Sequence, residues 1–346
     1  MILRRCEPDI QNLLQVLRGK KTRRVPLFEL FMDGPVNEYF AGHKADPEDP
    51  LGYLKMVIDA AYNAGYDYAT TTACNLAFPV KERKSGASVS MSGDGIITDW
   101  ESYEAYPWPD VSKCDFSILE DIKSYLPEGM KLAVMGPGGV LENVTAILGY
   151  DNLCMMLYDD PELLEAIFCR VGQTFVDYYK AAAPYESVGF LISNDDWGFN
   201  TQTFLSVPDM RKYVFPWHKQ IAAAAHACGK PVVLHSCGYM NDVMDDIIDD
   251  MKYDAKHSYE DNILCVEDSY KKWGDRITIL GGLDLQYLFA SDPEQIYKRC
   301  TDILNLTKEK GRYALGTGNS MAYYIPVERY EAIIRACNDF NREMEA

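Results

Sequence analysis

Two side chains in this sequence have the types and the spacing of metal ligands. His235 and Cys237 follow the apolar run 232–234, and Gly238 comes next. Side chains alternate along a strand, so His235 and Cys237 point to the same side. An imidazole and a thiolate on one side make up half of a zinc site, whereas the alternative is a buried histidine near an unrelated cysteine. Because the pair stands at a strand end, we expect it to bind zinc.

A third ligand is expected from the next strand along the chain. The run 253–257 ends in His257, and Glu260 follows in the predicted loop. We expect His257 to be the third ligand, with Glu260 as the competing candidate. Three protein ligands are enough for a catalytic zinc ion, because its fourth position is open to water or substrate.

Acidic and polar residues follow other predicted strands. Glu29 lies inside the apolar run 25–31, so it either faces a site or is paired. Asp195 and Asp196 follow the run 189–193, where an acid pair can move protons or bind metal, or else form a helix cap or turn. We expect catalytic roles for these three acids. Substrate contacts are expected from Trp197, Asp284 and Asn319.

The chain predicts eight strands that alternate with helices along its whole length. The strands are expected at 25–31, 68–72, 131–135, 189–193, 231–235, 253–257, 276–280 and 312–315. This order is typical of a (β/α)₈ barrel, which carries its chemistry at the carboxyl ends of the strands. A doubly wound open sheet is the alternative. Residues 86–100 alternate around Gly93 and Gly95 and predict an inserted β-hairpin.

Helices are expected between these strands, and no linker divides them. Their ranges are 9–19, 51–64, 151–158, 161–183, 208–228, 240–251, 266–273, 293–310 and 326–340. Residues 103–109 are aromatic and broken by proline, which predicts a loop. We therefore expect a single domain over residues 1–346.

The composition is that of a soluble globular protein, which we expect in the cytoplasm. The net charge of −18 argues against binding to nucleic acid or to anionic membranes. Ten cysteines are scattered without close pairs, which indicates reduced thiols. The first residues carry charge and lack the apolar core of a signal peptide or membrane span.

The order of motifs resembles the uroporphyrinogen decarboxylase superfamily, whose fold is a (β/α)₈ barrel. The resemblance covers nearly the whole chain. It rests on the first strand with its acid, the hairpin near 86–100, Gly149-Tyr150-Asp151 with Asp160-Pro161-Glu162, Ser206-Val207-Pro208 before a long helix, His235-Ser236-Cys237-Gly238, Gly281-Gly282-Leu283-Asp284, and Gly316-Thr317-Gly318-Asn319 before Ile325-Pro326.

Two branches of the superfamily are distinguished by their motifs. True decarboxylases carry arginines just after the first strand, where this chain has Met32-Asp33-Gly34. Cobalamin-linked methyltransferases resemble this chain at His235 and Cys237, which correspond to their first two zinc ligands. Their third ligand is a cysteine in the loop of the last strand, where this chain has Thr317.

The resemblance implies a zinc-dependent methyltransferase of the O-demethylase kind. Its methyl donor would be a methoxylated, aromatic compound, and its acceptor the cobalt of a separate corrinoid protein. Zinc with a single thiolate is a stronger Lewis acid, which suits an oxygen leaving group. The alternatives are a methylcobamide:thiol methyltransferase of the coenzyme M type, a uroporphyrinogen decarboxylase, and a non-catalytic corrinoid- or tetrapyrrole-binding protein. A homodimer is compatible with the sequence.

Overall fold

A curled sheet of seven parallel strands forms the centre of the fold, in the order β1 to β7. The computed structural model describes residue 3 and residues 6–80 and 95–345. The strands are β1 (Tyr68–Thr72), β2 (Lys131–Met135), β3 (Val188–Asn194), β4 (Val232–His235), β5 (Ala255–His257), β6 (Thr278–Leu280) and β7 (Tyr313–Ala314). Because every strand pairs with its sequence neighbour, all seven carboxyl ends meet at one edge.

Helices connect the strands. The α-helices before β3 are α1 (Ile10–Leu17), α2 (Gly34–Ala41), α3 (Gly52–Ala64), α4 (Trp100–Ala105), α5 (Ile118–Asp121), α6 (Val140–Leu148), α7 (Tyr150–Asp159) and α8 (Pro161–Ala182). Those after β3 are α9 (Val207–Asp209), α10 (Phe215–Ala227), α11 (Val266–Trp273), α12 (Leu285–Ala290), α13 (Pro293–Thr307) and α14 (Val327–Glu345). Short 3₁₀ turns are η1 (Val111–Lys113) and η2 (Ile122–Ser124), and π-helical turns are η3 (Met210–Val214) and η4 (Asp246–Asp250).

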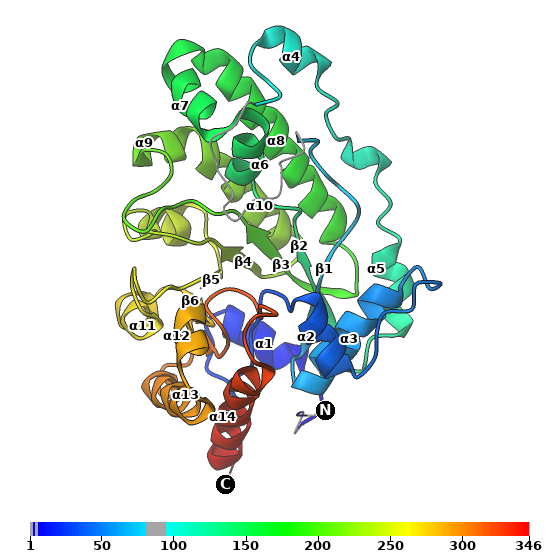
Figure 1. The fold of residues 1–346 in the computed structure, drawn as a ribbon, viewed down its shortest axis with the longest axis vertical. Helices are drawn as coiled ribbons and strands as arrows, with labels where there is room; N and C mark the ends of the chain where they lie inside the picture. Colours follow the sequence, from blue (N-terminus) through cyan, green and yellow to red (C-terminus); the bar gives the residue numbers. More distant parts are fainter. Residues whose placement is uncertain (1–2, 4–5, 81–94, 346) are drawn as a thin grey trace.

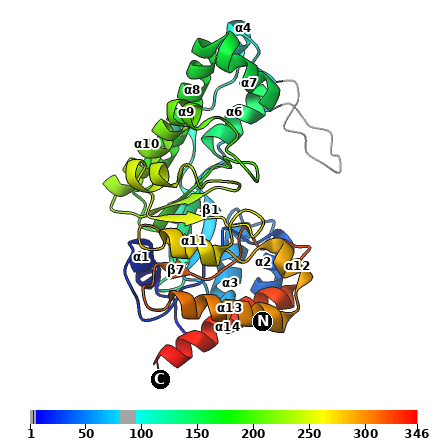
Figure 2. The ribbon, with the colours of Figure 1, turned by 90° about the vertical axis from the view of Figure 1, so that its left-hand side faces the viewer.

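The sheet lies between two groups of helices. Figures 1 and 2 show α4 and α6–α10 on one side of it, and α1–α3 and α12–α14 on the other. The strands are therefore covered on both faces, and β2, β3 and β4 are buried along most of their length. No helix in the described part of the chain is both long and apolar enough to cross a membrane.

The first predicted strand is not part of the sheet. Residues 27–32 are extended, but they make only isolated parallel bridges, Leu27 with Leu315 and Met32 with Met321. Within the described residues, no backbone hydrogen bond joins 27–32 to β1. Instead of the expected eight-stranded barrel, the structure has seven paired strands and a segment that is joined to residues 315 and 321 by isolated bridges.

A tyrosine side chain joins this segment to β1. The Tyr68 hydroxyl accepts a hydrogen bond from the Glu29 N–H at 2.7 Å and donates one to the Glu29 carbonyl oxygen at 2.5 Å. These two bonds satisfy backbone groups that would otherwise require a neighbouring strand. We call the junction between residues 27–32 and β1 the seam.

Four other expectations differ from the structure. The helix expected at 240–251 is reduced to a short helical stretch that contains the π-helical turn η4. Most of the predicted hairpin at 86–100 lies outside the described residues, and its described end is not a strand. The predicted loop at 103–109 begins inside α4. The long helix expected at 208–228 is π-helical at 210–214, because Pro216 lacks the N–H of a regular α-helical bond.

Candidate functional site

Three potential metal ligands meet where β3 and β4 end. His235 closes β4, Cys237 lies two residues later, and Asp196 lies two residues beyond the end of β3. The parallel register pairs Asn194 with His235 and so brings the two loops together. The candidate ligand atoms of Asp196, His235 and Cys237 all lie within 4.8 Å of one another. We call these three residues the metal-ligand cluster.

The donor set of this cluster fits zinc. The Cys237 Sγ lies 3.7 Å from the His235 Nε2. Ordinary zinc bond lengths and a tetrahedral angle would separate such atoms by about 3.6 Å. Burial raises the pKa of the Asp196 carboxyl and of the Cys237 thiol, and it lowers the pKa of His235. A bound dication would compensate the cost of burying the two anionic ligands.

Hydrogen bonds set His235 in the tautomer that a metal requires. The Thr317 carbonyl oxygen lies 3.0 Å from the His257 Nε2, which must therefore carry the hydrogen. Burial lowers the pKa of His257 to about 3, so this ring is neutral and its Nδ1 accepts. The His235 Nδ1, 2.8 Å away, then donates to it. The remaining His235 Nε2 keeps a lone pair and faces Cys237.

The structure places the two expected third ligands outside the cluster. His257 orients the His235 ring instead of joining the candidate ligand atoms. Glu260 accepts a hydrogen bond from the Gly238 N–H at 2.9 Å. Asp196, which we expected to be catalytic, takes the third position and accepts from the Cys237 N–H at 2.8 Å.

The loop that carries Cys237 is held from several sides. Gly238 adopts φ +90°, and a Cβ there would collide with the Gly198 backbone. The Asn319 side chain donates to the Cys237 Sγ at 3.3 Å, so Asn319 does lie beside the cluster. The buried Lys256 ammonium donates to the carbonyl oxygens of Ser236 and Ser258. The sequence analysis did not name Lys256 as a site residue, although a lysine inside a predicted strand indicates a buried charge that needs partners.

Two of the expected site residues make structural contacts instead. The Asp195 carboxylate accepts from the N–H groups of Leu141 and Glu142 at 2.9 Å each, at the start of α6, and lies 2.9 Å from the His218 Nε2. Trp197 is fully buried and its ring packs against His218 and Phe215. These contacts give Asp195 the geometry of a helix cap and Trp197 that of a core residue.

Asp284, the third expected residue of this kind, caps α12. It accepts hydrogen bonds from the backbone N–H groups of Gln286 and Tyr287. It also accepts from the Asp261 N–H at 3.0 Å. Its carboxylate is therefore used in the local turn.

Glu142 is a carboxyl that the sequence did not indicate. Its Oε2 is buried and has no hydrogen-bond partner among the described residues. Burial and the neighbouring Asp195 and Asp196 raise the pKa of Glu142 to about 8. The helix that carries it, α6, was not predicted, because the glycines at 136–139 suggested only a turn.

Glu29 faces Thr317 instead of the metal-ligand cluster. The Thr317 hydroxyl donates to the Glu29 Oε1 at 2.5 Å, and the Thr317 N–H donates to the Oε2 at 3.3 Å. Burial raises the pKa of Glu29 to about 8. Thr317 stands where the resemblance places a cysteine ligand, but its side chain is used to hold Glu29.

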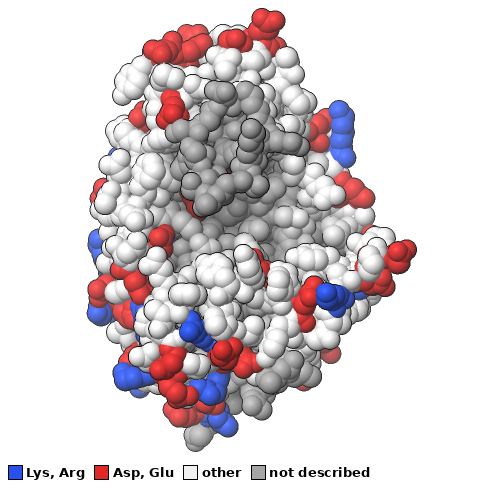
Figure 3. Space-filling model, viewed as in Figure 1, with Lys and Arg blue, Asp and Glu red and all other residues white. Residues whose placement is uncertain are grey.

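Charged side chains are unevenly distributed over the face of the molecule seen in Figure 3. Figure 3 shows a hollow on this face, and the atoms visible around it, apart from the grey ones, are mostly of uncharged residues. Asp and Glu side chains gather toward the edge of the same view.

Comparisons with known proteins agree with the fold. Residues 118–340 match the family described as uroporphyrinogen decarboxylase (URO-D). A methylated-thiol–coenzyme M methyltransferase of Methanosarcina mazei is 25% identical over 201 residues, which cover 56% of this chain and 49% of that relative. The match thus spans about half the length of that protein.

A solved structure, a methyltransferase from Methanosarcina mazei, superposes with a TM-score of 0.70 at 15% identity, over 96% of this chain and 99% of that one. This likeness shows the shared fold. The family match covers more than half of the chain. The chain therefore belongs to the uroporphyrinogen decarboxylase family.

Proposed function

We propose that this protein is a methyltransferase that moves a methyl group between a small methylated compound and the corrinoid of a partner protein. Zinc would be held by Asp196, His235 and Cys237. The observation that carries the proposal is the hydrogen-bond order from Thr317 through His257, which leaves the His235 Nε2 lone pair facing Cys237. The methyltransferase names of the two relatives support the same reading.

The chain's own residues would prepare the site for this reaction. Zinc would supply Lewis acidity, which stabilises negative charge on an atom that loses a methyl group. His257 orients His235, and Asn319 donates a hydrogen bond to the sulfur of Cys237. The Lys256 ammonium, held beneath the loop, offsets part of the negative charge of Asp196 and Cys237.

The preferred methyl donor is a methoxylated aromatic compound. A cluster with one thiolate, one imidazole and one carboxylate is harder than a site with two thiolates. Such a site favours a departing oxygen over a departing sulfur. The bond between methyl carbon and oxygen would break with its electron pair left on the phenolate, and the methyl group would pass to the Co(I) corrinoid of the partner.

A methylated thiol is the second candidate donor. The observation that favours it is the name of the 25% identical relative, a methylated-thiol–coenzyme M methyltransferase. A uroporphyrinogen substrate is disfavoured, because Met32 and Asp33 stand where arginines would bind its carboxylates. We expect no coproporphyrinogen when the protein is incubated with uroporphyrinogen.

Metal analysis tests the cluster. We expect about one zinc per chain, lost in the variants Asp196→Ala and His235→Ala/Cys237→Ala because these remove ligands. His257→Ala should weaken zinc binding about 10- to 100-fold, as removal of an orienting partner does. Glu260→Ala is the matched control and should retain zinc. Full zinc content in the double variant would place the metal elsewhere.

A visible-spectrum assay tests the reaction. The zinc-loaded protein is mixed with a Co(I) corrinoid protein and either 2-methoxyphenol or dimethyl sulfide. Methylation of the cobalt by 2-methoxyphenol supports the preferred donor, and methylation by the sulfide alone supports the second. If neither donor reacts and methylcobalamin does not methylate a thiol, the proposed function is wrong.

A further inference from the structure

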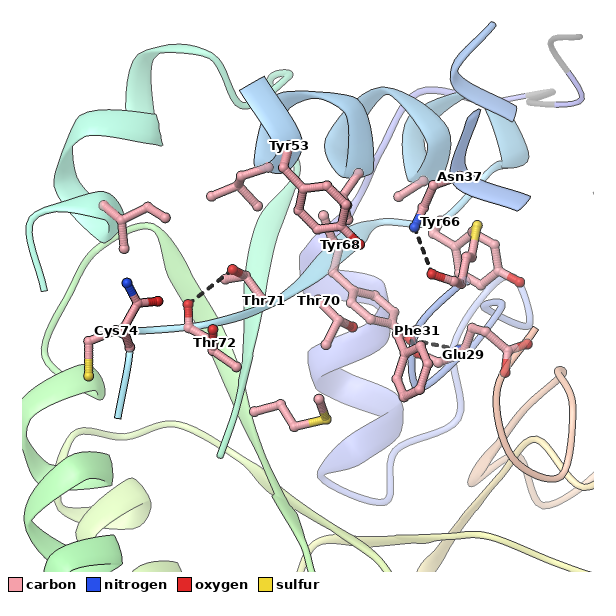
Figure 4. A pocket seen from close by; sticks show the side chains of 18 of the residues that line it. Glu29, Phe31, Asn37, Tyr53, Tyr66, Tyr68, Thr70, Thr71, Thr72 and Cys74 are labelled. Carbon is pink, nitrogen blue, oxygen red and sulfur yellow. Dashed lines mark hydrogen bonds between the residues drawn. The ribbon is translucent and has the colours of Figure 1, made fainter. Parts of the chain in front are cut away.

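A cavity of about 420 Å³ lies at the seam. Its walls come from the segment 27–32, from α2 and α3, and from both faces of β1. The lining includes Glu29, Phe31, Tyr53, Val57, Tyr68 and Thr70. Figure 4 shows Glu29, Phe31 and Tyr68 toward one end of this seam cavity and Cys74 toward the other. The cavity lies along the edge of β1 with which no strand pairs in the described part of the chain.

The part of the lining that the structure describes is mainly apolar and contains no cation. Aromatic and aliphatic side chains predominate, and its polar groups are hydroxyls and amides together with the carboxyl of Glu29. Among the described residues that line it, none is Lys, Arg or His. An anionic ligand would lose its hydration without gaining a charged partner, which is unfavourable in a largely apolar cavity.

Two buried residues, Thr317 and His257, connect the inner end of the seam cavity to the metal-ligand cluster by hydrogen bonds. Glu29 is hydrogen-bonded to Thr317, whose carbonyl oxygen binds His257, which in turn contacts His235. At the outer rim, the Phe31 and Tyr53 side chains are 39% and 59% exposed, so the cavity opens to solvent. A ligand that enters past the rim would have its far end beside Glu29.

We propose that the seam cavity binds the ring of an uncharged aromatic methyl donor, such as a methoxyphenol, and rejects anionic donors of the same shape. This inference rests on the proposed function. The volume lies within the range of small-molecule pockets, roughly 300–1,000 Å³. Aromatic walls suit stacking with a ring, and hydroxyl groups along β1 suit hydrogen bonds to a phenol.

Direct binding tests the inference without turnover. Calorimetric titration of the zinc-loaded protein compares 2-methoxyphenol with 2-methoxybenzoate, which differs chiefly in its negative charge. We expect the phenol to bind at least tenfold more tightly. Val57→Phe fills the cavity and should weaken phenol binding at least tenfold. The matched control Val327→Phe, at a half-buried valine outside the cavity, should bind like the wild type.

A second variant covers the case in which Val57→Phe fails to fold. Tyr53→Ala removes an exposed rim residue and should weaken phenol binding several-fold. Its matched control is Tyr324→Ala, because Tyr324 is 54% exposed and lies outside the cavity. The inference is overturned if the affinity for 2-methoxyphenol is unchanged both in Tyr53→Ala and in a folded Val57→Phe. Equal binding of 2-methoxybenzoate and 2-methoxyphenol by the wild type also overturns it.

The outcomes separate this inference from the proposed function. If zinc binds and another donor methylates the corrinoid while no methoxyphenol binds, the seam inference is wrong and the proposed function stands. If the phenol binds in the cavity but no methyl transfer occurs with any donor, the proposed function is wrong and the seam cavity remains a site for neutral aromatic compounds.

Discussion

At the scale of single residues, Glu29 is a buried carboxyl with a raised pKa. Both of its oxygens accept hydrogen bonds from Thr317. Among the described residues, no positively charged side chain donates a hydrogen bond to this carboxylate. Its charged form is therefore poorly stabilised, and burial raises its pKa from 4.5 to about 8. The folded protein holds a proton on Glu29 that the unfolded chain loses near pH 4.5.

This proton makes stability depend on pH. Between about pH 4.5 and 8 the folded state binds more protons than the unfolded state, so the contribution of Glu29 is present at low pH and lost as the pH rises. Glu29→Gln should remove this slope. The difference in free energy of unfolding between wild type and variant should change by about 2–3 kcal/mol between pH 5.5 and 7.5. Urea unfolding measures it.

An exposed acid provides the control for this prediction. Glu104→Gln should keep the pH dependence of the wild type, because Glu104 is exposed. If Glu29→Gln also keeps that dependence, Glu29 is ionised in the folded protein at neutral pH.

At the scale of elements, the start of α12 depends on Asp284. Its carboxylate satisfies two N–H groups of the first helical turn and a third in the loop at Asp261. Asp284→Ala should lower the free energy of unfolding by about 1–2 kcal/mol, as loss of a helix cap does. Asp284→Asn should recover part of this loss. Urea unfolding measures both effects.

Zinc content and KM separate this structural role from the substrate contact expected from the sequence. Asp284→Ala should leave both unchanged if the carboxylate serves only as a cap. A raised KM with unchanged stability would instead support the substrate contact.

The strands in the middle of the chain could be predicted because each has its own apolar pattern. The bounds expected for 68–72 and 131–135 are those of β1 and β2. The segment 25–31 has a similar pattern, but a strand also needs a partner on its edge, and local sequence does not report pairing. The same limit applies to Asp196, which lies past a strand end where side-chain alternation no longer gives direction.

In the site, too, the residues with a local sequence pattern could be predicted, and those that depend on distant partners could not. The spacing of His235 and Cys237 within and just beyond one strand placed them together, and the structure brings their ligand atoms close. The position of His257 relative to this pair depends on a hydrogen bond to Thr317, sixty residues away in the sequence. Such a bond has no local signal, so His257 was expected to bind metal and not to orient His235.

At the scale of the whole molecule, Tyr68 substitutes for a missing strand contact. Tyr68→Phe should leave the Glu29 N–H and carbonyl oxygen buried without their partner, which costs about 1–3 kcal/mol. Hydrogen exchange of the Glu29 amide should become faster, because this N–H has no backbone acceptor in the sheet. Mass spectrometry of peptides that span 27–32 measures it.

Another buried tyrosine serves as the comparison. Tyr179→Phe removes a hydrogen bond to the Ile192 carbonyl oxygen and should leave exchange at 27–32 unchanged. If Tyr68→Phe also leaves that exchange unchanged, the seam is held by other contacts.

The seam also has a consequence for the order in which the protein can be built during synthesis. Strands β2 to β7 each pair with the strand before them, so the sheet can grow as the chain emerges from the ribosome. Glu29, however, meets Thr317 only after 288 further residues have been made. Closing so long a loop is entropically costly until the intervening sheet is in place. A nascent chain can thus assemble both loops of the metal-ligand cluster well before it completes the wall of the seam cavity.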